Sequence, residues 1–197
     1  MKRLIILCVL LLTFSAGAAE KVIEQQGSWS IIEQDNWSKP RYILSAEDYN
    51  GKFKLICSTD NNKILFAVYY YHAQRLDNLS KSTELLVSLD RKRNKNNFFG
   101  TMFNYSKNIV FWTNNLDYSG YFKDYDQEKA KLTPIFSQLF KQFASATGNI
   151  TFTAKGEGDT LYQASLSSEG LPVMFDHFAK YCGADFMTAF DIPVEEK

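Results

Sequence analysis

The segment SEGLPVMFDHFAKYCG, residues 168–183, decides how we expect this chain to fold. Ser168 is a candidate N-cap, Pro172 suits the first turns of a helix, and Gly183 suits its end. The apolar side chains between them recur at helical spacing and share one face, which carries Leu171, Phe175, Phe178 and Cys182. The pattern therefore predicts an amphipathic last helix with Cys182 on its buried face.

Cys57 is the partner that we predict for Cys182. It lies in the run FKLICST, residues 53–59, where alternation places Phe53, Leu55 and Cys57 on one inward face of a strand. The third cysteine, Cys8, belongs to an N-terminal leader. Two cysteines in an exported chain favour a disulfide, here between the end of the chain and its early sheet. Two buried, unpaired thiols are the alternative.

The N-terminus has the pattern of a secretory signal peptide. Lys2 and Arg3 precede an apolar run at residues 4–12, and small residues follow at positions 16–19. The run is shorter than the roughly 20 apolar residues that a membrane span needs. We predict cleavage after Ala18, and a mature protein in the periplasm or the medium. Residues 19–190 are predicted to form one domain, and residues 191–197 a mobile acidic tail.

Charge and composition favour a folded domain without an electrostatic preference for nucleic acid. The chain of 197 residues has 22 basic and 22 acidic side chains, and hydrophobic residues make up 45% of it. Loss of Lys2 and Arg3 leaves a net charge of −2 on the mature protein. We therefore expect no nucleic-acid partner and no stable membrane insertion. The oligomeric state stays open.

Short alternating runs predict an antiparallel α+β fold, with about seven to nine strands in a sheet or sandwich and two helices in the C-terminal part. Asn50-Gly51 is a strong hairpin signal. Residues 63–71, KILFAVYYY, are apolar on both faces, as in a central strand. Residues 19–26 are expected to be a polar lead-in, and residues 114–126 a long loop. The predicted strands are residues 28–34, 41–46, 53–59, 63–71, 85–89, 98–105, 108–113, 149–155 and 160–166.

The first of the two helices is expected to start with Thr133 as its cap and Pro134 in its first position, and to end near Gly148. Its apolar stripe consists of Ile135, Phe136, Leu139, Phe140 and Phe143. This stripe predicts that the helix packs on the sheet.

Catalytic and metal-binding motifs do not occur in the sequence. His72 and His177 are the two histidines, and each is interpreted as a surface or satisfied residue, because a catalytic base needs a positioned nucleophile. We predict no catalytic residues, no metal site and no cofactor. Pairs of carboxylates, which a hydrolase would need, cannot be recognised from spacing alone.

Two surfaces are candidates for binding. Tyr69, Tyr71 and Trp112, with Tyr70, either form a sugar- or peptide-stacking surface or belong to the sheet core. The basic run at residues 91–95, RKRNK, either holds an anionic head group or polyanion or is a solvated hairpin turn. We prefer the structural alternative in both cases, namely the sheet core for the aromatic residues and a solvated turn for the basic run.

The layout of the chain resembles small periplasmic proteins of Gram-negative bacteria. The likeness rests on the leader, on Gly27-Ser28-Trp29-Ser30, on Leu55-Ile56-Cys57, and on the closing pattern GLxxxFxxFxxxC from Gly170 to Cys182. It is similar in these features to the invasion-associated locus B family and to the TagO/VasI accessory proteins of type VI secretion. The resemblance implies a non-enzymatic accessory or virulence-linked protein, and only the two cysteines carry over as functional residues.

Two functions follow as hypotheses. The preferred one is a periplasmic binding or accessory protein that contacts an envelope or secretion-system protein through its β-rich domain. The alternative is a hydrolase, or an inhibitor, that acts on envelope polymers through carboxylates that the sequence does not pair.

Overall fold

The fold is described from a computed structural model. It covers residues 20–35, 39–60, 62–71, 83–89, 95–105, 108–113, 116–117, 127–155 and 161–193. The predictions for the leader, for His72, for residues 91–94 and for residues 194–197 lie outside this part of the chain.

Eleven strands form one antiparallel sheet, with the order β1-β2-β3-β4-β5-β8-β7-β6-β10-β11 and β9 beside β5. The predicted α+β class with C-terminal helices is confirmed. The strands are β1 (Glu20–Gln26), β2 (Trp29–Gln34), β3 (Arg41–Glu47), β4 (Gly51–Ser58), β5 (Lys63–Tyr70), β6 (Thr83–Leu89), β7 (Lys95–Tyr105), β8 (Asn108–Thr113), β9 (Leu116–Asp117), β10 (Asn149–Lys155) and β11 (Leu161–Ser167).

Two strands were not expected from the sequence. The supposed polar lead-in is the edge strand β1, which pairs with β2 along Glu20–Gln26 although most of its side chains are exposed. The supposed loop at residues 114–126 contains β9, which adds two residues to the edge of β5. Neither strand has the apolar alternation on which the prediction relied, because an edge strand is held by its backbone ladder more than by burial.

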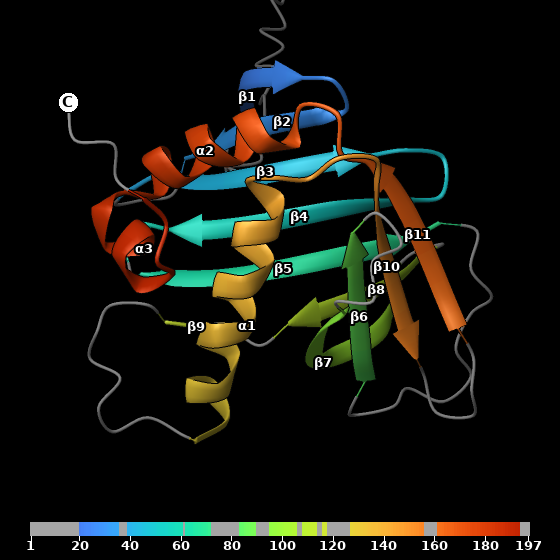
Figure 1. The fold of residues 1–197 in the computed structure, drawn as a ribbon. Helices are drawn as coiled ribbons and strands as arrows, with labels where there is room; N and C mark the ends of the chain where they lie inside the picture. Colours follow the sequence, from blue (N-terminus) through green and yellow to red (C-terminus); the bar gives the residue numbers. More distant parts are fainter. Residues whose placement is uncertain are drawn as a thin grey trace, which may run out of the picture.

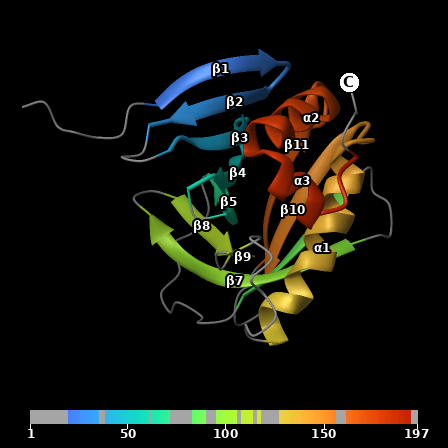
Figure 2. The same ribbon diagram turned by 90° about the vertical axis from the view of Figure 1, so that its left-hand side faces the viewer.

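The sheet folds over on itself. In Figure 1, β2 to β5 run across the view, whereas β6, β10 and β11 run nearly upright in front of them. The long strand β7 joins the two halves, since its first residues pair with β6 and its last with β8 (Figure 2). Gly100 lies where the pairing changes, and a Cβ there would stand 2.3 Å from the Trp112 carbonyl oxygen. The bend therefore depends on a residue without a side chain.

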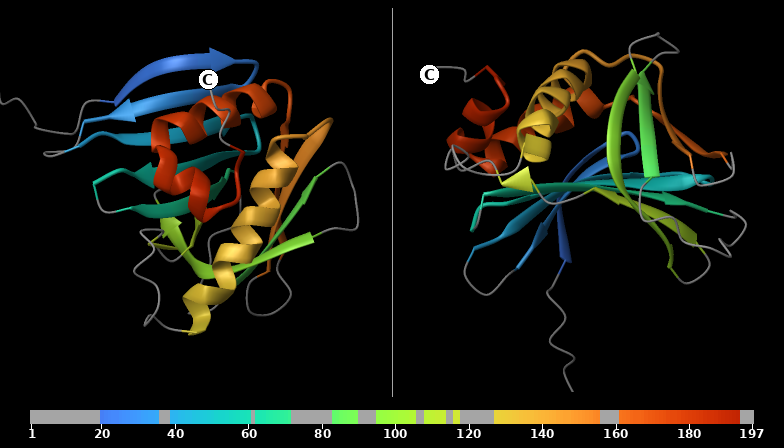
Figure 3. Two further views of the ribbon diagram at one scale, coloured as in Figure 1. Left: turned by 60° about the vertical axis from the view of Figure 1, so that its left-hand side comes forward. Right: turned by 90° about the horizontal axis from the view of Figure 1, so that it is seen from below.

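Three helices lie on one face of the sheet, seen from two sides in Figure 3. They are α1 (Gln127–Phe143), α2 (Leu171–Cys182) and α3 (Ala184–Ala189). We call the helix-covered face the inner face and the opposite one the outer face. Helix α1 starts six residues before the predicted cap Thr133, and Pro134 lies inside it. The run before the proline, QEKAKL, is rich in strong helix formers, which explains the earlier start.

Helix α2 follows the prediction at its end and departs from it at its start. Gly183, with φ 93°, ends the helix, and its N–H donates to the carbonyls of Ala179 and Lys180. The N-cap is Gly170 in place of the predicted Ser168, whose hydroxyl donates to the Gly148 carbonyl instead. Helix α3 was not predicted at all. It lies at the C-terminal end of the predicted domain, where the sequence analysis expected no helix.

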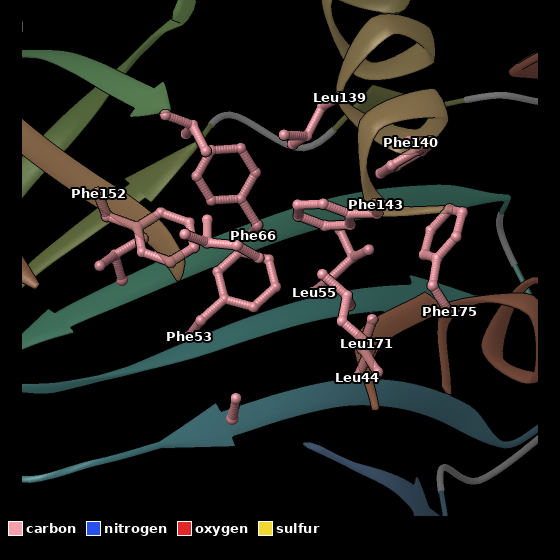
Figure 4. Packing of buried hydrophobic residues seen from close by; sticks show 14 of the residues in the cluster. Leu44, Phe53, Leu55, Phe66, Leu139, Phe140, Phe143, Phe152, Leu171 and Phe175 are labelled. Carbon is pink, nitrogen blue, oxygen red and sulfur yellow. The ribbon is translucent and has the colours of Figure 1, made fainter. Parts of the chain in front are cut away.

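Phenylalanine rings fill the space between the inner face and the helices. Phe53 of β4 stacks on Phe152 of β10 with centroids 5.0 Å apart, and it meets Phe143 of α1 edge-on at 6.0 Å (Figure 4). Full burial of such a ring contributes about 1.5–3 kcal/mol. Both halves of the sheet and α1 therefore share one core.

The ends of the chain are joined across this core. Cys57 of β4 and Cys182 of α2 form the predicted disulfide, with Cα atoms 6.0 Å apart and a sequence separation of 125. The indole Nε1–H of Trp29 donates to the Ser167 carbonyl at 2.8 Å. Within the described ranges, none of the helices has the length and hydrophobicity required to cross a membrane.

Candidate functional site

The two faces of β5 separate the tyrosines that the sequence placed together. Ile64, Phe66, Val68 and Tyr70 belong to the core, with Tyr70 1% exposed. Because side chains alternate along a strand, Tyr69 points to the outer face, and Tyr71, just beyond the strand, continues that row. The core reading is therefore correct for Tyr70, whereas Tyr69 and Tyr71 are half-buried on the surface.

The pairing of β5 with β8 brings Trp112 beside Tyr69. Trp112 lies opposite Ala67, and Tyr69 lies opposite Val110, so the two rings occupy diagonal positions on the outer face. Diagonal neighbours in an antiparallel pair are about 7–8 Å apart, within reach of aromatic side chains. Trp112 is 39% exposed. We call Tyr69, Tyr71 and Trp112 the outer aromatic cluster.

Tyr71 is held in place by two charged residues of the β3–β4 hairpin. Its hydroxyl donates to Glu47 Oε1 at 2.6 Å, and Lys52 Nζ donates to Glu47 Oε2, also at 2.6 Å. Partial burial, and then the bond to Glu47, raises the pKa of Tyr71 above its usual range. The bonds from Lys52 and Tyr71 lower the pKa of Glu47. The Tyr71 ring is therefore fixed by its hydroxyl, which reduces the entropy lost when a partner binds it.

The tip of the same hairpin adds a further ring that the sequence analysis missed. Tyr49 is 78% exposed, and the next residue, Asn50, accepts a hydrogen bond from the Tyr71 backbone at 2.9 Å. The Asp48 carboxylate caps this turn by accepting from the N–H groups of Asn50 and Gly51. The Asn50-Gly51 pair predicted this turn from the sequence. Because Tyr49 directly precedes the pair, its exposure at the tip of the hairpin could have been predicted as well.

Beside the cluster, a lysine and a glutamate from strands that are not neighbours approach each other. Lys54 of β4 approaches Glu20 of β1 at 3.9 Å. Since β2 and β3 lie between these strands, the two side chains reach toward each other over the outer face. Ile43, on the outer face of β3, is only 2% exposed. Lys52 and Lys54, each paired with a glutamate, border the outer aromatic cluster.

His177 lies on the other side of the molecule and belongs to a separate cluster. Its Nδ1 is 2.5 Å from Glu24 Oε2, and the Tyr181 hydroxyl donates to Glu24 Oε1 at 2.8 Å. The Tyr181 ring in turn packs on Tyr42, with centroids 5.0 Å apart. The bonds from His177 and Tyr181 lower the pKa of Glu24. This arrangement clamps the edge strand β1 to α2.

Neither a metal site nor a related protein of known function helps to interpret the two clusters. In the ranges that the structure describes, no three His, Cys, Asp or Glu side chains are arranged to hold a metal ion. Comparison with protein-family models, with curated proteins and with solved structures gave no match.

Proposed function

We propose that this protein is an exported, periplasmic binding or accessory protein that acts through protein–protein contacts in the cell envelope. The leader and the disulfide support the compartment, because disulfides persist in oxidising environments. The resemblance to periplasmic accessory proteins directs the search for a partner to envelope and secretion-system proteins.

The observation that carries the proposal is the outer aromatic cluster. Tyrosine and tryptophan are enriched at protein interfaces, where a few such residues supply most of the binding energy. Within the cluster Trp112 is exposed and Tyr71 is pre-oriented by Glu47, and the exposed Tyr49 lies at the tip of the hairpin that holds Tyr71. The three helices lie on the opposite face of the sheet (Figure 3).

Site-specific photo-crosslinking tests the proposal. A benzophenone amino acid at position 112 or 49, introduced in the cells that export the protein, should yield one defined adduct that mass spectrometry identifies as an envelope protein. The same residue at position 173 is the matched control, because Val173 is 44% exposed on α2, on the helix side. Equal crosslinking from positions 112 and 173, or none from either, would remove the cluster as the contact surface.

The alternative, a hydrolase or an inhibitor acting on envelope polymers, has less support. Glu24 beside His177 is the carboxylate that comes nearest to an acid–base site. A general acid needs a raised pKa so that it keeps its proton near neutral pH. The hydrogen bonds to Glu24 act in the opposite direction and favour the ionised, structural form. Incubation with peptidoglycan fragments should therefore give no turnover that depends on Glu24.

A further inference from the structure

A polar groove of about 640 Å³ runs along the exposed side of α1. It is bordered on its other side by the chain that follows α3. The polar residues that line it are Thr133, Ser137, Gln138, Lys141 and Gln142 of α1, and Asp191 beyond α3. Its volume lies within the range of about 300–1,000 Å³ that is usual for ligand sites.

Both walls of the groove are fixed before any ligand arrives. Phe190, at the end of α3, packs on Phe136 and Phe140 of α1 with centroid distances of 6.0 and 5.0 Å. Lys141 Nζ and Asp191 Oδ2 are 3.6 Å apart and join the walls. The ion pair is exposed to solvent, so a ligand's own charged groups can replace it at little cost. The groove is therefore preformed, with one exchangeable contact across it.

A buried amide orients the carboxamide of Gln142. Asn96 of β7 is 2% exposed, and its Nδ2 donates to Gln142 Oε1 at 2.8 Å. With that oxygen engaged, the two N–H groups of Gln142 remain to serve as donors. Asn96 Oδ1 has no hydrogen-bond partner among the described residues. An unsatisfied buried acceptor costs about 1–3 kcal/mol. Asn96 does not line the groove, so its contribution to the site is the orientation of Gln142.

We propose that this groove binds an extended peptide segment through its main chain. Hydroxyl and carboxamide groups both donate and accept, which matches the alternating N–H and C=O groups of a peptide. Thr133, Ser137 and Lys141 are spaced by one helical turn, so the polar row is about 12 Å long. About four extended residues at roughly 3.3 Å each span that length.

The chemistry of the lining decides between a peptide and a glycan. Among the described residues, the groove is lined besides its polar residues by Pro134 and Ala189, and none of these offers an aromatic ring on which a sugar could stack. The free ends or charged side chains of a peptide can pair with Lys141 and Asp191. This site lies on the helix side of the molecule and is independent of the outer aromatic cluster, so the inference goes beyond the proposed function.

Nuclear magnetic resonance of the full protein, labelled with ¹⁵N, tests the proposal. The probe is tetra-alanine with blocked ends, added up to its solubility limit. The side-chain NH₂ signals of Gln138 and Gln142 should shift and saturate. Tetra-alanine with N-methylated peptide groups should bind more weakly, because it lacks the N–H donors. Chitotetraose is the glycan arm of the experiment.

Matched variants locate the binding. Gln138→Ala and Gln142→Ala should each weaken tetra-alanine binding about two- to twelvefold, the range expected for the loss of one hydrogen bond. Gln163→Ala removes an exposed carboxamide from β11, away from the groove, and should leave the affinity unchanged. Melting temperatures of all three variants verify folding. Absence of any shift, a response to chitotetraose alone, or full affinity in the Gln138→Ala/Gln142→Ala double variant would overturn the proposal.

Discussion

Gly27 and Gly170 lock the N-terminal hairpin to the start of α2 by a reciprocal close approach. A Cβ added to Gly27 would stand 2.5 Å from the Glu169 carbonyl oxygen, and one added to Gly170 would stand 2.5 Å from the Gln26 carbonyl oxygen. Both residues have positive φ, at 59° and 84°. Each glycine therefore faces a carbonyl group of the residue that precedes the other.

Gly170→Ala should lower the free energy of unfolding by about 2–4 kcal/mol. The left-handed backbone alone costs about 1–2 kcal/mol for a residue with a Cβ, and the clash with Gln26 adds to it. Gly183→Ala is the matched control, because Gly183 also has positive φ but no atom within 4 Å of an added Cβ. Urea unfolding of the two variants isolates the close approach. Equal losses would show that contact between the hairpin and α2 is not tight.

Replacement of both Cys57 and Cys182 by serine should cost about 2–5 kcal/mol of stability. The disulfide closes a loop across 125 residues, and both sulfurs are buried, at 0% and 4% residue exposure. The native, oxidised protein should resist alkylation until it is both unfolded and reduced. Mass spectrometry after iodoacetamide treatment checks this, and alkylation of both cysteines without reductant would contradict the disulfide.

Glu24→Gln should flatten the acid limb of the stability curve. The pKa of Glu24 is lowered in the folded state, so the unfolded state takes up this proton at a higher pH. The stability that the clamp contributes is present above the ordinary glutamate pKa and is lost as the pH falls through the lowered value. For such a half-exposed cluster the loss should not exceed about 1 kcal/mol, and salt should reduce it.

Thermal melts of the wild type and of Glu24→Gln between about pH 7 and pH 3 measure this difference. Glu169→Gln, at another exposed glutamate, is the control and should follow the wild-type curve. A wild-type acid limb that Glu24→Gln leaves unchanged would mean that the contacts with His177 and Tyr181 do not persist in solution.

Tyr71→Phe should weaken partner capture by the outer face while keeping the ring. The variant loses the hydrogen bond to Glu47, worth about 1 kcal/mol at an exposed site, and with it the fixed ring orientation. Tyr71→Ala should weaken capture more, because the contact area is lost as well. Crosslinking yield from position 112 measures both effects. Equal yields in all three proteins would place the contact elsewhere on the face.

The periodicity of apolar residues was sufficient to predict an element wherever burial selects its side chains. The inward face of β4, the apolar run of β5 and the stripe of α2 were all predicted, because burial selects their side chains. Periodicity was insufficient where an element is held by backbone hydrogen bonds or by polar side-chain contacts. The edge strand β1 depends on the ladder to β2 and on the clamp at Glu24, and neither leaves an apolar pattern.

The sequence predicted which residues form the candidate site, but not which of them lie side by side. The sequence indicated the aromatic residues, but β5 pairs with β8 and not with the next strand in the chain. The neighbourhood of Tyr69 and Trp112 depends on that long-range pairing. The groove beside α1 was equally hidden, since one of its walls is the chain after α3, a helix that the sequence analysis did not predict.

The contacts of Gly27, Trp29 and Cys57 with residues beyond position 160 have a consequence for biosynthesis. Strands β2 to β4 find their closing partners more than 100 residues later in the sequence. In a truncated chain that stops before α2, the inner face of β2 to β4 would be exposed to solvent, and Cys57 would remain a free thiol. The disulfide and the cover over β2 to β4 therefore both require α2, so the seal and the cross-link form together or not at all.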